Sequence, residues 1–342
     1  MPDPNVRTPQ QDMLFGYMPA QILHVAARLG LADVLADGPK TSAEVAAATE
    51  THPPSLHRLL RALACLGVVT EIEAGRFELT PEGAQLRSDT PESIRGLVML
   101  FCGDEVWRAW GNLLHSVRTG GSAFEYVTGM PPFEFLAAHP EQSATFDAAM
   151  ADHTRKVAPE IIAGYDFGRF STIVDVGGGD GTLMAAILRA VPAARGILFD
   201  LPAGVEPAPT TLKSAGVADR CRVVAGSFFK SVPEGGDAYL LKSVIHDWDD
   251  DRAAAILRTC RSAMGPASSL QVIEPVLPPR IESPAEITGL VMSDINMLVN
   301  TGGRERTEVE FRSLFAAAGL DVTAVVGPFA PSGYRVIEGA PA

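Results

Sequence analysis

Short apolar runs alternate with helical segments from Phe170 to the end of the chain. The segments between the runs, such as 183–191, carry apolar residues at helical spacing. This alternation of strands and helices predicts an α/β fold with a doubly wound sheet. The last two runs suit a hairpin whose final strand runs against the parallel strands. The expected strands are 171–176, 196–200, 221–225, 237–242, 269–274, 319–326 and 334–338.

The first part of the chain, from about residue 10 to residue 89, has a mostly helical pattern. Thr41 and Glu44 have the spacing of a capping box at the start of a helix, and Gly67 is suited to end another. Three helices followed by a hairpin predict a winged helix-turn-helix. The expected elements are helices over 21–29, from 41 onward and over 53–66, and strands over 68–72 and 76–79.

A winged helix can bind DNA, and its third helix offers His57, Arg58 and Arg61 as contacts. Between residues 39 and 95, however, there are six basic and eight acidic side chains, and the whole chain has a net charge of −13. A protein that reads duplex DNA needs several cationic contacts to phosphate. A dimerisation scaffold is therefore the preferred interpretation, and a ligand-responsive regulator is the alternative.

Residues 91–165 are expected to form helices that link the two parts. Their aromatic side chains are expected mostly to fill core between the domains, with one or two lining a pocket for a flat substrate. Met150 and His153 stand three residues apart on the last helix and could touch a ligand, although a solvent-facing or capping role is the alternative for His153. The aromatic residues are Trp107, Trp110, Phe124, Tyr126, Phe133, Phe135 and Phe146.

A glycine-rich run, Asp-Val-Gly-Gly-Gly-Asp-Gly-Thr, follows the first strand of the second half. Gly177, Gly179 and Gly181 allow a ligand to approach the main chain closely. A dinucleotide fingerprint would need glycine where Thr182 stands. Asp175 adds a carboxylate at the strand end, so the turn suits a ligand with a cationic amine better than a pyrophosphate. A tight turn without a ligand is the alternative.

Polar residues also follow the next three strands, at the edge where open α/β sheets hold ligands. Asp200 ends the second strand and could accept hydrogen bonds from two ribose hydroxyls. Ser227 and Phe228 follow the third strand, where the aromatic ring could lie against an adenine. Lys242 ends the fourth strand and either contacts the ligand or pairs with a structural acid.

His246 comes directly after the fourth strand. The ordinary pKa of histidine, about 6.5, suits a base at neutral pH, and such a base can take the proton of a phenol, whose pKa is about 10. A base needs an orienting partner, and Glu274 and Glu305 are the candidates. A capping histidine beside Asp247 is the alternative.

The acidic run 247–251 lacks the spacing of an EF-hand loop, and helix capping accounts for it, so we expect no metal. The four cysteines have no C-x-x-C spacing, which favours free thiols in a reducing compartment. Residues 1–11 lack the apolar stretch of a signal peptide, and no apolar run reaches the roughly 18 residues of a membrane span. We expect a cytoplasmic protein without nucleic-acid or membrane partners.

Four ordered motifs resemble those of the small-molecule O-methyltransferases, which use S-adenosylmethionine. This family includes plant caffeate and flavonoid enzymes and bacterial enzymes that tailor polyketides and antibiotics, and the resemblance covers nearly the whole chain. The motifs are Asp-Val-Gly-Gly-Gly-Asp-Gly at 175–181, Phe-Asp-Leu-Pro at 199–202, Leu-Lys-Ser-Val-Ile-His-Asp-Trp at 241–248 and Gly-Gly-Arg-Glu-Arg-Thr at 302–307.

The resemblance implies a homodimer that methylates a phenolic hydroxyl of an aromatic secondary metabolite, as in antibiotic biosynthesis. N-methylation, or hydroxylation or decarboxylation that uses the same cofactor, is the alternative. The expected domains are a winged-helix-like dimerisation domain (10–90), a helical linker contributing to the substrate pocket (91–165) and a Rossmann-like methyltransferase domain that binds S-adenosylmethionine (166–342).

Residue roles follow from the same resemblance. His246 is the general base, flanked by Glu274 and Glu305. The cofactor-binding residues are Asp175, Gly177, Gly179, Asp200, Leu201, Ser227, Phe228 and Lys242. The substrate-binding residues are Met150, His153, Asp247, Asn296 and Asn300.

One position departs from the family pattern. The family usually has Gly-Asp-Phe-Phe, with the aspartate reaching the adenine amine, whereas this chain has Ser227 at that place. A serine hydroxyl can accept a hydrogen bond without charge assistance. The sequence therefore predicts weaker cofactor binding, or an adenine held mainly by Phe228.

Overall fold

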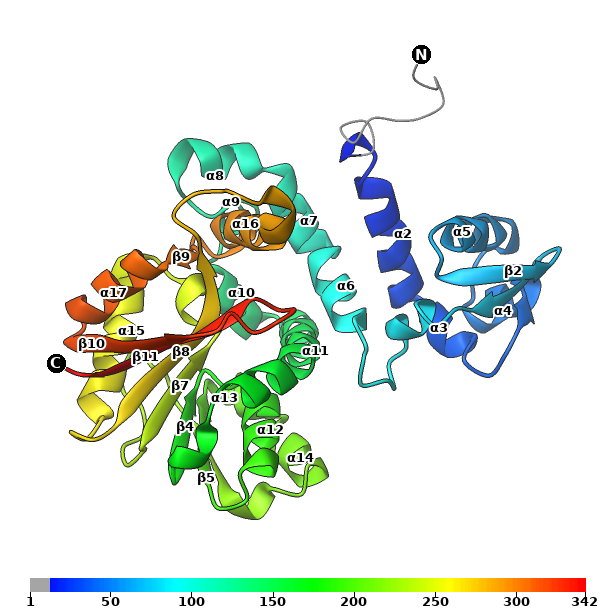
Figure 1. The fold of residues 1–342 in the computed structure, drawn as a ribbon. Coiled ribbons are helices and arrows are strands. Elements are labelled where there is room, and N and C mark those ends of the chain that lie inside the picture. The colour runs from blue at the N-terminus through cyan, green and yellow to red at the C-terminus, as the bar shows by residue number, and fades with distance from the viewer. Residues whose placement is uncertain (1–12) are drawn as a thin grey trace. The chain divides into compact units, whose positions relative to one another are not determined.

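A computed structural model describes residues 13–342 and divides the chain into two compact units (Figure 1). The first unit contains the residues up to Trp107 together with Ala148–His153, and the second contains Arg108–Asp147 and Thr154–Ala342. Within the described residues, no helix is both long and apolar enough to cross a bilayer. The predicted three-domain boundaries remain a prediction.

The first unit has the three predicted helices and the hairpin in the predicted order, with an additional one-turn helix at Leu31–Val34 that was not predicted. The capping box is present, because Glu44 N donates to Thr41 Oγ1 (3.2 Å) and Thr41 N donates to Glu44 Oε2 (2.7 Å). A two-residue strand that the sequence did not indicate completes a three-stranded sheet of order β1-β3-β2. The elements are α2 (Tyr17–Arg28), α3 (Leu31–Val34), β1 (Lys40–Thr41), α4 (Ser42–Ala48), α5 (Pro53–Cys65), β2 (Val69–Glu73), β3 (Arg76–Leu79), η1 (Gly83–Leu86) and α6 (Arg95–Phe101).

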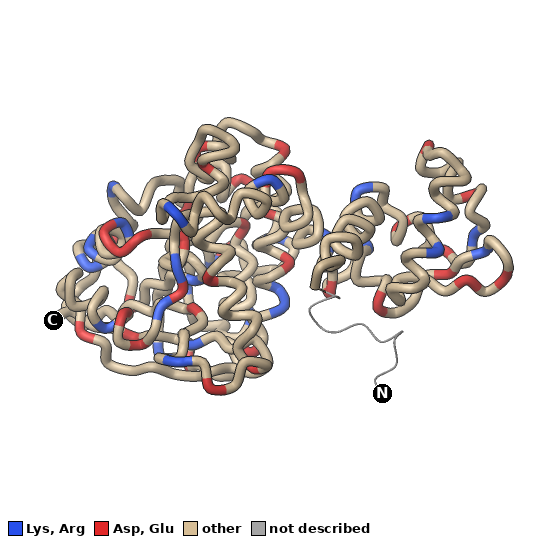
Figure 2. The backbone as a smooth tube through the Cα atoms, turned by 90° about the horizontal axis from the view of Figure 1, so that it is seen from above, with Lys and Arg blue, Asp and Glu red and all other residues tan. Residues whose placement is uncertain are grey.

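The core of the first unit is formed by apolar side chains of its helices and its hairpin. Val45, Leu60, Leu63 and Phe77 are fully buried and belong to one cluster. Acidic and basic positions are interspersed along this unit (Figure 2). Among the described residues of this unit, the basic positions therefore do not stand apart from the acidic ones.

The second unit contains the predicted doubly wound sheet. Its strand order is β10-β11-β8-β7-β4-β5-β6, and β11 runs antiparallel to both β8 and β10, as the sequence predicted for the closing hairpin. The strands are β4 (Thr172–Val176), β5 (Arg195–Asp200), β6 (Cys221–Ala225), β7 (Ala238–Lys242), β8 (Ser269–Leu277), β9 (Arg306–Thr307), β10 (Leu320–Val326) and β11 (Tyr334–Pro341).

Strand β8 differs from the prediction. It continues beyond Glu274 to Leu277, so Glu274 lies within the strand and not at its end. The extension pairs with the short strand β9, where Val276 is opposite Arg306. This pairing brings residues near 305 to the edge of the sheet at which β7 ends.

Helices cover both faces of the sheet (Figure 1). Ile173 packs into one core and the next residue, Val174, into the other, which explains why the strands are continuously apolar. The helices and short turns of this part are η2 (Phe167–Arg169), α12 (Thr182–Ala190), α13 (Pro202–Val205), α14 (Ala208–Ser214), η3 (Ala218–Arg220), η4 (Ile245–Asp247), α15 (Asp250–Ala263) and α17 (Glu308–Ala317).

Helices α8 (Leu113–Thr119) and α9 (Ala123–Thr128) pack on a long helix, α16, which is inserted between β8 and β9. Phe124 and Phe135 pack with Val299 in a small separate core, whereas Tyr126 is exposed. Some of the predicted aromatic residues therefore fill core within this unit. The elements are α7 (Asp104–Gly111), α8 (Leu113–Thr119), α9 (Ala123–Thr128), α10 (Pro132–Ala138), α11 (Pro140–Gly164) and α16 (Pro284–Asn300).

The segment before β9 crosses the turn that follows β7 at very short range. Arg304 N donates to His246 O (2.8 Å). A Cβ atom on Gly303 would lie 2.0 Å from His246 O and 2.5 Å from the carbonyl carbon of Asp247. Glycine is therefore required at 303 for the two segments to touch.

We expect Gly303→Ala to destabilise the protein by about 1–3 kcal/mol, because main-chain atoms must move apart. Gly289→Ala in α16 is the matched control: nothing lies within 4 Å of its added Cβ, and alanine should be neutral or stabilise by about 0.5–1 kcal/mol. Calorimetric unfolding of both variants measures the difference. Equal stability of the two would contradict the close contact.

Candidate active site

The glycine loop between β4 and α12 adopts a conformation that requires glycine. Gly177, Gly179 and Gly181 have φ angles of 75°, 56° and 80°, in the left-handed region that side chains disfavour. A Cβ on Gly177 would lie 2.8 Å from Val244 Cγ2, whereas the space beside Gly179 is open. The loop therefore leaves room for a ligand at Gly179.

Asp200, at the end of β5, holds this loop from the neighbouring strand. Its Oδ2 accepts a hydrogen bond from Gly179 N (2.8 Å), and its Oδ1 accepts one from Leu201 N (2.6 Å). Burial raises the pKa of the carboxyl group, and the two N–H groups act in the opposite direction. Each oxygen keeps a further lone pair that could accept from a ligand.

Asp175 lies below the glycine loop and is almost fully buried. Its Oδ2 has no hydrogen-bond partner among the described residues. Burial, together with the charge of Asp200, raises its pKa to about 7, against the influence of Lys242. A buried acid that lacks a donor is suited to a ligand that brings a cationic group.

Lys242 ends β7 on the same edge of the sheet. Its Nζ donates to Thr154 Oγ1 (3.0 Å) and lies 5.7 Å from the centre of the Tyr334 ring. Burial lowers the pKa of Lys242 to about 8, although Asp175 and Glu274 favour its charged form. Both readings of Lys242, a ligand contact and a structural pair, are compatible with this position.

Aromatic rings gather beside the turn that follows β6. Phe229 and Phe228 meet Trp248 edge-on, at centroid distances of 4.8 and 6.1 Å, and Phe133 stacks on the same indole at 5.1 Å. Phe228 also lies 3.7 Å from the position of a Cβ on Gly177. The ring predicted to contact adenine therefore lies next to the glycine loop.

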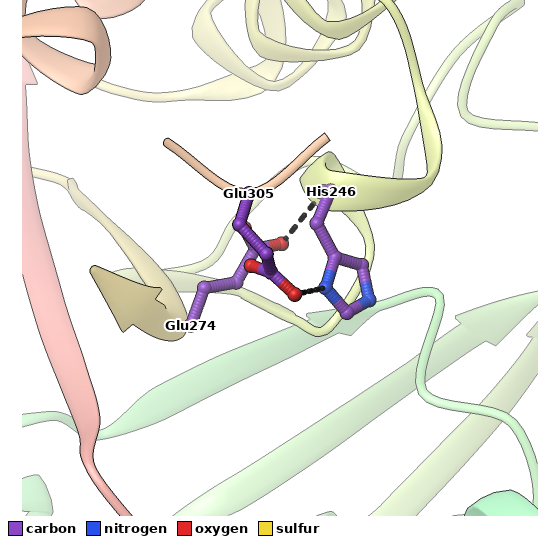
Figure 3. A group of neighbouring side chains, drawn as sticks. All are labelled: His246, Glu274 and Glu305. Carbon is purple, nitrogen blue, oxygen red and sulfur yellow. Dashed lines mark hydrogen bonds and ion pairs between the residues drawn. The ribbon is translucent and has the colours of Figure 1, made fainter. Parts of the chain in front are cut away.

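His246 lies in η4, directly after β7, and its ring is fixed by Glu305. His246 Nδ1 is 3.0 Å from Glu305 Oε1, and Figure 3 shows the ring turned toward this carboxylate. Ser293 Oγ donates to the same oxygen (2.7 Å), and Asp294 Oδ1 accepts from Glu305 N (2.9 Å). In the neutral form of the ring, the carboxylate favours a proton on Nδ1 and thus leaves the lone pair on Nε2.

Glu274 acts on the main chain and not on the imidazole. Its Oε1 accepts hydrogen bonds from the N–H groups of Val244 (3.1 Å), Ile245 (2.7 Å) and His246 (3.1 Å). Figure 3 shows the last of these three hydrogen bonds. Of the two acids predicted as partners of His246, only Glu305 hydrogen-bonds to the ring. Glu274 shapes the turn that carries it.

The charges in this cluster make His246 a stronger base than free histidine. Burial alone would lower its pKa, but Glu274 and Glu305 outweigh that effect and raise it to about 10. Burial raises the pKa of Glu274 to about 7, whereas contact with His246 keeps the pKa of Glu305 below its usual value despite burial. Glu305 is thus the stable negative partner of the imidazole.

Within the acidic run after His246, Asp249 caps α15, as the sequence predicted for this run. Its side chain accepts a hydrogen bond from Arg252 N (2.8 Å). His246, Glu274 and Glu305 themselves offer potential metal-ligating atoms within 4.8 Å of one another. The expectation of a metal-free site remains a prediction.

The predicted acceptor residues are only partly brought together. On α16, Asn296 Oδ1 accepts from Trp110 Nε1 (3.1 Å) and from Asn300 Nδ2 (2.7 Å). Asn300 Oδ1 is buried and has no partner among the described residues. Asp247 is half-buried beside His246, and burial raises its pKa to about 6.

Met150 and His153 lie on the part of α11 that belongs to the first unit, and their role as substrate contacts stays a prediction. The sequence analysis did not identify Thr154, Ser293, Asp294 or Tyr334, which contact site residues here. Ser293 and Asp294 lie just before the segment that contains Asn296, but nothing in the sequence placed them at Glu305.

Comparison with protein families supports the expected relationship. Residues 110–321 match the O-methyltransferase domain, and residues 11–88 match the O-methyltransferase dimerisation domain. Together these two matches span most of the chain.

Two sequence relatives and one solved structure extend this result. Phenazine O-methyltransferase PhzM of Lysobacter antibioticus is 46% identical over 96% of this chain and 94% of its own. An 8-amino-8-demethylriboflavin N,N-dimethyltransferase of Streptomyces davaonensis is 40% identical over 90% of this chain and 88% of its own.

The solved structure of the O-methyltransferase NcsB1 from neocarzinostatin biosynthesis, in complex with S-adenosylmethionine and 2-hydroxy-5-methyl naphthoic acid, is 35% identical. It superimposes with a TM-score of 0.78 and covers 95% of this chain and 96% of that one. The fold, the glycine loop and these similarities lead to one conclusion: the chain belongs to the S-adenosylmethionine-dependent O-methyltransferase family.

Proposed function

We propose that this enzyme methylates a phenolic hydroxyl of an aromatic secondary metabolite, with His246 as the general base. The observation that carries the proposal is the His246–Glu305 pair at the edge of the sheet that also holds the glycine loop. When bound, S-adenosylmethionine supplies an electrophilic methyl group on a positively charged sulfur. The residues of the chain must therefore hold this cation and make the acceptor oxygen nucleophilic.

The carboxyl edge of the sheet fits the donor. The partnerless Oδ2 of Asp175 suits a cationic group, and the open side of Gly179 allows close approach. Asp200 offers its remaining lone pairs to hydroxyl groups. The residues that would hold the cofactor are Asp175, Gly177, Gly179, Asp200, Leu201, Ser227, Phe228 and Lys242.

The acid–base match supports a phenol as acceptor. Nε2 of His246 takes the hydroxyl proton, and Glu305 stabilises the imidazolium ion that forms. The two carboxylates beside the ring raise the pKa of His246 above its ordinary value, toward that of a phenol, which is about 10 for tyrosine's acidity. The neutral form of this imidazole is therefore a stronger base than free histidine and can take the proton of the acceptor hydroxyl.

Methylation of an aromatic amine is the second candidate, because the riboflavin relative is named as an N,N-dimethyltransferase. A neutral amine already has a nucleophilic lone pair, so it depends less on a base before attack. We also propose that the enzyme works as a homodimer, since residues 11–88 match a dimerisation domain. The cytoplasmic setting stays a prediction from the sequence.

A panel of paired aryl alcohols and aryl amines, assayed with labelled S-adenosylmethionine and mass spectrometry, tests the function. We expect methyl transfer to oxygen, and His246→Ala should lower that turnover by roughly 10²–10⁴-fold. His52→Ala, which changes an exposed histidine of the first unit, is the control. Unchanged turnover in His246→Ala would indicate catalysis by proximity alone, and transfer only to amines would support the second candidate.

The pH dependence tests the role of Glu305. The neutral imidazole is the active base, so kcat/KM should rise with pH up to the pKa of His246, which lies above the ordinary 6.5. Glu305→Gln removes a negative charge, so the pKa should fall and the rising limb should move to lower pH. Measuring the pH profile of kcat/KM with two acceptors whose phenols differ in pKa distinguishes ionisation of the enzyme from ionisation of the substrate. A limb that follows the acceptor, or that stays in place in Glu305→Gln, argues against the assignment.

The serine at 227 gives a test of cofactor binding. Ser227→Asp should tighten S-adenosylmethionine about fivefold to tenfold, because a carboxylate makes a stronger hydrogen bond to an amine. Calorimetry with the donor and with its demethylated product, which lacks the sulfonium charge, measures the change. If the carboxylate introduced at position 227 forms a local hydrogen bond to adenine, the affinities for both ligands should increase equally. An increase for the donor alone, or an equal increase in the nearby Ser231→Asp variant, would indicate only a long-range effect of the added charge.

A further inference from the structure

Arg306 is the largest fully buried side chain among the described residues. It follows Glu305 and begins β9, at the point where this strand pairs with the end of β8. A buried guanidinium group is strongly destabilising unless its donors are satisfied. The partners of this group therefore indicate why the chain tolerates it.

Every N–H donor of Arg306 has an acceptor. Nε and Nη2 donate to Asp250 Oδ1 (3.0 and 2.8 Å). Nη1 donates to Ile245 O (3.1 Å), with a longer contact to Arg304 O (3.5 Å), and Nη2 also donates to Trp248 O (2.8 Å). Five donors in a rigid plane are what arginine has and lysine lacks.

Two of these acceptors are carbonyl groups on either side of His246. Arg306 binds the carbonyls of Ile245 and Trp248, and Arg304 N binds the carbonyl of His246 itself. Glu274 binds the N–H groups from the opposite side of the turn. Three successive residues, 304–306, thus contact the turn through a main-chain N–H, a carboxylate and a guanidinium.

Asp250 ties this arrangement to the following helix. It lies in the first turn of α15, where a negative charge is favourable, and its side chain is 62% exposed whereas that of Arg306 is 0% exposed. The pair therefore joins a solvated acid on the helix to a buried cation under the turn.

We propose that Arg306 is a positioning residue for the methyl transfer: it fixes the main chain on both sides of His246 and so aims the imidazole at the acceptor. This inference rests on the proposed role of His246. Glu305 holds one ring atom, but the direction of Nε2 also depends on where the main chain of the turn lies. A displacement of about 1 Å at a reacting group can lower the rate by about 10²-fold.

The experiment compares Arg306→Met, Arg306→Lys and Asp250→Asn with the control Arg312→Met, which removes an exposed arginine paired with Glu308 on α17. We expect Arg306→Met to lower kcat 10- to 100-fold, with the acceptor KM and the calorimetric Kd for the demethylated cofactor product within threefold of the original values. Arg306→Lys keeps three donors and should be intermediate. Hydrogen–deuterium exchange should accelerate over residues 244–248.

A double-mutant cycle with His246→Ala separates positioning from packing. If Arg306 acts through His246, Arg306→Met should have little further effect in the His246→Ala background. Fully multiplicative losses, or a lower melting temperature with unchanged kcat of the folded fraction, would overturn the inference. If Arg306→Met does not fold, the same cycle with His246→Ala is measured for Arg306→Lys and Asp250→Asn.

Failure of the proposed function has a different signature. If His246→Ala leaves turnover unchanged, the proposed role of His246 as the base is wrong. If hydrogen–deuterium exchange over residues 244–248 is unchanged in the Arg306 variants, Arg306 does not fix the turn.

Discussion

The turn after β7 leaves the sheet, so its main-chain groups lose the partners that a neighbouring strand would provide. Glu274 accepts from three of its N–H groups, and Arg306 donates to two of its carbonyls. A buried anion and a buried cation thus replace sheet hydrogen bonds at the place where His246 stands. Neither charge is tolerated in a dry interior without these partners, so the turn and the two charges depend on each other.

The same cluster raises the basicity of His246. His246 stands beside two carboxylates that favour its protonated form, and burial alone cannot reverse this preference. The positive charge of Arg306 helps to keep Glu274 and Glu305 ionised. Charge balance around the ring is therefore a property of the whole cluster and not of one pair of residues.

Much of the sheet could be predicted from the sequence because strands buried on both faces are continuously apolar; the buried strands β4 and β7 each begin one residue after the predicted start and end at the predicted residue. The two-residue strands β1 and β9 are too short to show any pattern. Strand β8 was predicted too short because Pro275, which has no N–H, suggests a strand end. In the structure that proline is opposite Tyr334 of β11 and the strand continues.

The site was predictable where its residues are local in sequence. The glycine loop and His246 follow strand ends, so their place on the sheet edge could be expected. The different roles of Glu274 and Glu305 could not, because they depend on how distant segments cross the turn. Arg306 was missed for a related reason: a charged residue normally indicates a surface position, and only the assembled turn provides its acceptors.

Asp200 accepts hydrogen bonds from the N–H groups of Gly179 and Leu201. The glycine loop and the acid after β5 are thus joined by hydrogen bonds of the chain itself, which fix the arrangement of this end of the sheet. Little ordering entropy then opposes binding there.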